Sequence, residues 1–205
     1  MSTVYTGAEQ RVVLSSISWA TYVALSAELD RSRGRMTYDQ GVLEIMSPKL
    51  SHESAKNLLG RMIDRFTEIR SIDMRSSVST TFRRSDLQRG FEADESYYIE
   101  HAVDIRGKEE VDLAIDPPPD LVIEIEITRS SVNKQVLFAS MGIAEVWRYD
   151  GRMLWLGGLN GEVYTELSES RVLPGFPISL AHELLTIRSE ESETALIRRF
   201  VQRLG

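Results

Sequence analysis

The chain has 205 residues, 42% of them hydrophobic and 27% charged, which is typical of a single globular domain. It contains no cysteine, which excludes disulfides, zinc–thiolate sites and thiolate catalysis. The net charge of −7 argues against a surface that is basic throughout, as a general nucleic-acid-coating protein would have, but it is compatible with a local basic cleft.

No apolar run approaches the roughly 20 residues that a membrane-spanning helix needs. Residues 1–11 lack the basic-then-apolar order of a signal peptide. We therefore expect a cytoplasmic protein with no membrane partner. Because the sequence shows no internal repeat and no long linker, we expect one domain over residues 1–205, with a core at about 18–188 and a C-terminal helix at 189–204.

In chain order, the first predicted elements are a helix, a hairpin and a second helix. The first helix spans residues 18–29 and begins at a capping serine. The hairpin joins residues 36–38 to 42–46, and Gly41 supplies the positive φ of its tight turn. Ser51 is the predicted cap of the second helix. Its apolar residues recur at helical spacing: Ala55, Leu58, Leu59, Met62, Ile63, Phe66 and Ile69.

The remaining elements are mostly strands, with helices between and after them. Strands are predicted at 74–84, 96–100, 121–128, 145–149, 153–157 and 162–166, and helices at 130–141, 179–187 and 189–204. Three consecutive prolines at 117–119 cannot pair inside a sheet, so they mark the entry to the strand that follows. This order predicts an α/β fold with a mixed central sheet flanked by helices.

Residues 121–128 form the segment with the clearest chemical signal. Side chains alternate between the two faces of a strand, so Glu124 and Glu126 lie on one face and the isoleucines between them on the other. A half-exposed strand would show the same alternation. On a covered strand, however, two carboxylates on one face repel unless a cation lies between them. Magnesium, which takes few carboxylates and several waters, suits such a pair.

A metal site would need a further ligand from a neighbouring strand. Asp120 shares the face of Glu124 but lies four residues away, roughly 13 Å along the strand. Asp94 precedes the strand at 96–100, and it would lie beside Glu124 if the two strands pair. We therefore favour Asp94.

Several motifs together resemble the Uma-type restriction endonuclease family, which has the PD-(D/E)XK nuclease fold. The resemblance covers residues 18–185. It rests on the stretch at 118–128 (PPDLVIEIEIT), on Lys134, on the stretch at 142–150 (GIAEVWRYD), and on the hairpin end at 44–48 (EIMSP) with the His52-Glu53 pair after it.

The resemblance implies that Asp94 and Glu124 bind magnesium or manganese, and that Glu53 is an accessory acid. The usual proline before the aspartate is Ala93 here, and the usual lysine position is Glu126. Glu126 would then act as a base or a further metal ligand. Lys134 could supply the ammonium from the following helix; the alternative is an ordinary surface lysine.

The expected function is magnesium-dependent endonucleolytic hydrolysis of DNA phosphodiester bonds. The alternative is a catalytically degenerate relative that binds nucleic acid or protein without turnover, and Glu126 in the lysine position favours it. His52 is expected at the surface where its helix starts, while His101 and His182 show no partner pattern.

Nucleases of this fold pair two active sites to cut both strands, so we also expect a homodimer. The last helix offers an apolar stripe as a dimer surface: Leu196, Ile197, Phe200, Val201 and Leu204. The alternative is that this stripe packs on its own domain.

Overall fold

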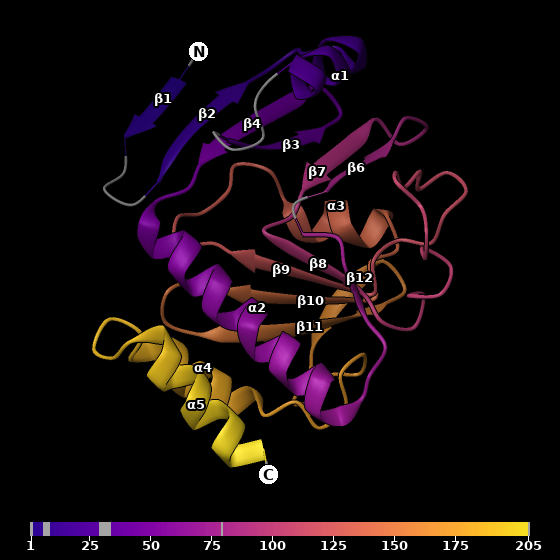
Figure 1. The fold of residues 1–205 in the computed structure, drawn as a ribbon. Coiled ribbons are helices and arrows are strands. Elements are labelled where there is room, and N and C mark those ends of the chain that lie inside the picture. Colours follow the sequence, from indigo (N-terminus) through magenta and orange to yellow (C-terminus); the bar gives the residue numbers. More distant parts are fainter. Residues whose placement is uncertain (1, 6–8, 29–33, 79, 205) are drawn as a thin grey trace.

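The computed structural model describes residues 2–5, 9–28, 34–78 and 80–204. Their strands form two six-stranded sheets (Figure 1). The first sheet is entirely antiparallel, in the order β1 (Ser2–Tyr5), β2 (Gln10–Leu14), β4 (Val42–Ser47), β3 (Arg35–Asp39), β7 (Arg89–Glu92) and β6 (Thr81–Arg84).

The second sheet is mixed and holds the acidic strand near its centre. Its order is β12 (Val163–Glu166), β11 (Leu154–Asn160), β10 (Glu145–Tyr149), β9 (Leu121–Ile125), β8 (Glu95–Tyr98) and β5 (Arg75–Ser76). β9 runs parallel to β10 and antiparallel to β8. The chain crosses from β9 to β10 through a helix, which is the usual connection between parallel strands.

Helices cover both faces of the second sheet. They are α2 (Leu50–Arg70), α3 (Lys134–Ser140), α4 (Ile178–Thr186) and α5 (Glu193–Leu204), while α1 (Trp19–Glu28) packs against the first sheet. The isoleucines of β9 pack in one core with α2, α4 and α5, and Val122 packs in another with α3. β9 is buried along its whole length, so Glu124 lies in the protein interior.

The predicted α/β class with a mixed sheet between helices is confirmed, but the first sheet was not foreseen as a separate layer. The predicted strand at 74–84 is two strands, β5 and β6, which lie in different sheets. β7 lies between the predicted strands at 74–84 and 96–100, where no strand was predicted. The hairpin at β3 and β4 is as predicted, with Gln40 and Gly41 both at positive φ.

Helix boundaries differ from the sequence predictions in several places. The first helix ends at Glu28, and Leu29 lies outside the described residues. Ser51 was expected to cap α2, but Lys49 is the N-cap and makes no side-chain cap bond. α3 begins only at Lys134, where the side chain of Asn133 accepts a bond from the N–H of Val136. In the described ranges, no helix has the length and apolarity needed to cross a bilayer.

The apolar stripe of α5 lies inside the domain. Leu196, Ile197 and Phe200 are buried in the core that α2 and α4 share, and Val201 and Leu204 pack at its edge. The use of this stripe as a dimer surface is therefore wrong, and its packing on its own domain is right.

Candidate active site

Asp94 and Glu124 lie opposite each other across two paired strands. β8 pairs with β9 so that Glu95 is opposite Ile123, and the next step in this register places Asp94 opposite Glu124. A direct bond holds this end of the pairing together, because Asp94 Oδ2 accepts from the N–H of Ile125 at 2.8 Å. Both carboxylates are buried.

Two cations hold the other oxygen of Asp94. Its Oδ1 accepts from Nε of Arg35 at 2.8 Å and from Nε2 of His52 at 2.9 Å. Burial alone would raise the pKa of Asp94, but the hydrogen bond and charge of His52, with the charges of Lys134 and Arg35, lower it to about 2. Asp94 is thus held as an anion.

His52 is fully buried, with 0% of its surface exposed, so its prediction as a surface residue is wrong. Its Nδ1 donates to Oε1 of Glu9 at 2.6 Å while Nε2 bonds Asp94. Burial would lower its pKa, but the hydrogen bonds to Asp94 and Glu9 raise it to about 9. The side chain is therefore an imidazolium at neutral pH, donating to a carboxylate from each nitrogen.

This pKa predicts that stability falls in alkaline solution. The pKa of His52 is about 9 in the folded protein, against an ordinary value of 6.5. The protonated side chain therefore stabilises the fold fully below pH 6.5, and this contribution is lost as the pH rises through 9. The loss amounts to about 3 kcal/mol. We expect the free energy of unfolding, measured with urea in EDTA, to decrease from pH 7 to 9. The fall should be absent in His52→Gln; an equal fall in that variant would contradict the assignment.

Glu124 is bonded through only one of its oxygens. Oε2 accepts from the Nζ of Lys134, so the first residue of α3 reaches the acidic strand. Oε1 is buried, and no donor among the described residues lies within hydrogen-bonding distance of it. Burial raises the pKa of Glu124 to about 7, although the charge of Lys134 opposes this. Glu124 therefore has a desolvated oxygen available to a ligand.

The structure places Glu126 and Glu53 beside this pair rather than within it. Glu126 accepts from the N–H of Ser130 at 2.8 Å and lies 3.5 Å from a guanidinium nitrogen of Arg148. Glu53 is separated from Asp94 by Arg35, whose guanidinium contacts both carboxylates. Neither glutamate is drawn into one group with Asp94 and Glu124.

The donor set fits a small hard cation in part. Within the residues described, no three histidine or acidic side chains converge as a ready metal site. A site made by Asp94, Glu124 and Glu126 together is therefore not formed in this arrangement. Glu124, through its free buried oxygen, and the anionic Asp94 opposite it supply two carboxylates. Magnesium commonly binds that number of carboxylates, together with water and substrate oxygens. These two residues would hold the ion.

Comparisons with known proteins identify the family and the fold of the chain. The family model described as "Uma2: Putative restriction endonuclease" matches residues 19–185. The chain belongs to the Uma2 family. Its fold resembles a crystal structure from Anabaena variabilis described as "a putative nuclease belonging to DUF820", with a TM-score of 0.54 and 17% identity over 90% of this chain and 99% of that one. A search of curated proteins found no match.

In this Uma2 chain, the first sheet supports the loop after the acidic strand. Arg11 of β2 donates to Glu9 at 2.9 Å, to Glu44 of β4 at 2.6 Å and to the carbonyl of Thr128 at 2.8 Å. Glu44 also accepts from the N–H of Ser131 at 2.7 Å. The hydrogen bonds to Thr128 and Ser131 thus connect the first sheet to the segment between β9 and α3, which leads to Lys134.

Two further predictions for this Uma2 chain can now be assessed. Asp120, set aside as a ligand, accepts from the N–H groups of Ile99 and His101 at 2.7 and 3.1 Å and so stabilises a turn. The ring of His101 also bonds Asp120, a partner that no pattern in the sequence indicated. His182 likewise has a partner, the carbonyl of Arg152 at 2.6 Å.

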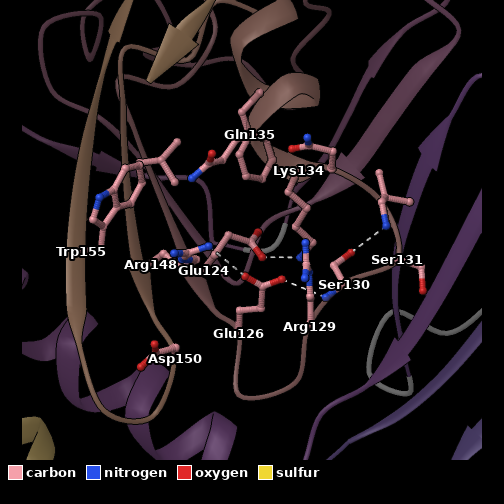
Figure 2. Close-up of a pocket in the computed structure, with 14 residues that line it drawn as sticks. Glu124, Glu126, Arg129, Ser130, Ser131, Lys134, Gln135, Arg148, Asp150 and Trp155 are labelled. Atoms are coloured by element: carbon pink, nitrogen blue, oxygen red, sulfur yellow. Dashed lines mark hydrogen bonds and ion pairs between the residues drawn. The ribbon is translucent and has the colours of Figure 1, made fainter. Parts of the chain in front are cut away.

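A pocket of about 500 Å³ opens beside Glu124 on the α3 side of the second sheet of this Uma2 protein. Figure 2 shows Trp155 and Arg148 on one side of it, Lys134 on the other, and Glu124 and Glu126 between them. The pocket therefore gives a ligand access to Glu124 and Glu126 at the end of β9.

Proposed function

We propose that this Uma2 protein is a magnesium-dependent endonuclease that hydrolyses DNA phosphodiester bonds. The observation that carries the proposal is the contact of Lys134 with Glu124, opposite Asp94. Two acids and an ammonium are the groups that nuclease chemistry in this fold requires, and here the ammonium comes from α3 instead of β9. The family and its nuclease-like relative support the general class.

The residues would divide the work as follows. Asp94 and Glu124 would hold the ion, which supplies Lewis acidity toward the attacking water and the phosphate. The ammonium of Lys134 would offset the negative charge that develops on the phosphate in the transition state. Glu126, which lines the pocket, would accept a proton from the attacking water.

The alternative is a relative that binds without cutting. The glutamate at position 126 and the two cations already bound to Asp94 favour it. The position of Lys134 favours catalysis, since a lysine with only a surface role would not be buried against Glu124. We therefore rank the endonuclease first.

Nicking of supercoiled plasmid tests the function. We expect the wild-type protein to convert plasmid to open circles with magnesium or manganese and not with EDTA, because both acids must hold the ion. Glu124→Gln should remove this activity, and Glu162→Gln on the exposed turn before β12 is the matched control. Equal nicking by the wild type and Glu124→Gln would mean a contaminating nuclease, and no nicking under any condition would favour the binding alternative.

Pairing of two copies remains part of the proposal, because cutting both strands calls for two active sites. Since the α5 stripe is buried, the contact would have to use another surface. We expect light scattering at micromolar concentration to give the mass of a dimer, twice the 23.3 kDa of one chain. The mass of a monomer at micromolar concentration would contradict the proposed dimer.

A further inference from the structure

The pocket beside Glu124 has a flat aromatic wall. Trp155 of β11 is partly exposed and lies across from Arg148 of β10 in the strand register. The Arg148 guanidinium carbon lies 5.4 Å from the centre of the indole, within cation–π range. The guanidinium therefore lies over the indole, and both side chains line the pocket at the edge of the proposed catalytic site (Figure 2).

Gly157 allows the indole to lie in this position. A Cβ at residue 157 would come within 2.1 Å of the Trp155 ring, so only glycine allows the ring to lie against the strand. Glycine in a strand interior commonly marks such a close approach. The ring therefore lies close to the backbone of Gly157, and part of its surface lines the pocket.

Two polar side chains of the pocket have no partner inside the described part of the protein. They are the exposed guanidinium of Arg129 and the amide of Gln135. A guanidinium matches the geometry of phosphate oxygens. An amide carries both donors and an acceptor, so it can bond the polar edge of any base. The pocket thus combines a stacking surface, a phosphate-binding cation and an adaptable hydrogen-bonding group.

We propose that this pocket holds one unpaired nucleotide of a nucleic-acid strand, with its base on Trp155 and its phosphate at Arg129. The proposal rests on the proposed function, since it names the substrate class of the same site. A base inside a duplex is reached only after it leaves the stack. A 500 Å³ pocket is of the size that encloses a small ligand. The preferred substrates are therefore single strands and locally unpaired duplexes.

Binding without metal tests this separately from cleavage. Anisotropy of a labelled dT12 strand, in EDTA, should show at least about tenfold tighter binding than the same strand annealed to dA12. Trp155→Ala should weaken dT12 binding roughly 5- to 150-fold, the range measured for loss of one stacked base. Trp155→Phe should recover most of it, because phenylalanine also stacks. Val163→Ala, an exposed position on β12, is the control.

Indole fluorescence gives a second readout should Trp155→Ala fail to fold. We expect dT12 to quench the fluorescence of the wild-type protein and, equally, that of Trp19→Phe. Trp19 should not contribute to the quench, because it packs with Tyr22 and Tyr38 against the first sheet. Trp155→Phe should lose the quench. The same pattern with rU12 also supports the proposal and identifies RNA as a ligand.

Three results would overturn the proposal: equal or tighter duplex binding, unchanged dT12 binding by folded Trp155→Ala, or no strand binding at all. If the protein binds dT12 but does not nick plasmid, the proposed nuclease function is refuted and the nucleotide-binding pocket is not. If the protein nicks plasmid with metal but binds single strand and duplex equally, the binding of an unpaired nucleotide is refuted and the nuclease function is not.

Discussion

Replacing His52 with alanine is expected to lower the free energy of unfolding by about 3–5 kcal/mol, because it leaves two buried carboxylates without their shared cation. His52 donates to Glu9 from one nitrogen and to Asp94 from the other, and no part of it is exposed. Since small domains are commonly stable by only 5–15 kcal/mol, this loss is severe. Urea denaturation at pH 7 measures it.

His182→Ala is the matched control for this prediction. His182 is also on a helix and also bonded, through Nε2 to a backbone carbonyl, but it lies at the surface of α4. Its loss should cost well under the His52 value, as surface substitutions usually do. If both variants lost the same stability, the buried ion network would not be the cause.

The acidic strand could be predicted because strand geometry fixes it locally. Alternation of isoleucine and glutamate assigns Glu124 to one face whatever the rest of the chain does. The pairing of Asp94 with Glu124 was also within reach, since it needs only that two neighbouring strands pair. The partner of Lys134 was harder, because it depends on where α3 starts: the helix begins at this residue, four residues later than predicted.

The cations around Asp94 could not be predicted by the same reasoning. His52 follows a hairpin at a helix start, where a polar residue is usually exposed. It is buried because the residue before β2, Glu9, bonds it, and β3 of the same unforeseen sheet brings Arg35 to Asp94 beside it. Such contacts join residues about 40 to 60 positions apart. Local periodicity carries no information about them.

Lys134→Met is expected to reduce plasmid nicking at least about 100-fold, the typical cost of one lost electrostatic contact to a transition state. Methionine keeps the length of the side chain and removes its charge. Glu124 would then be buried without its cation. Burial already raises its pKa to about 7, so it would become neutral near that pH and the fold should survive. Initial nicking rates and thermal melting together measure the two effects.

The control for this variant is Lys108→Met. Lys108 is a partly exposed lysine that pairs with Asp116 away from the pocket. Binding of manganese, followed by calorimetry, separates the ion from the chemistry. Lys134→Met should bind manganese at least as well as the wild type, because the positive charge of the ammonium on Glu124 repels an ion held by the same carboxylate. Full nicking by this variant would mean that another group stabilises the negative charge of the transition state. In that case Arg129 and Arg148, the other cations that line the pocket, are the next groups to replace.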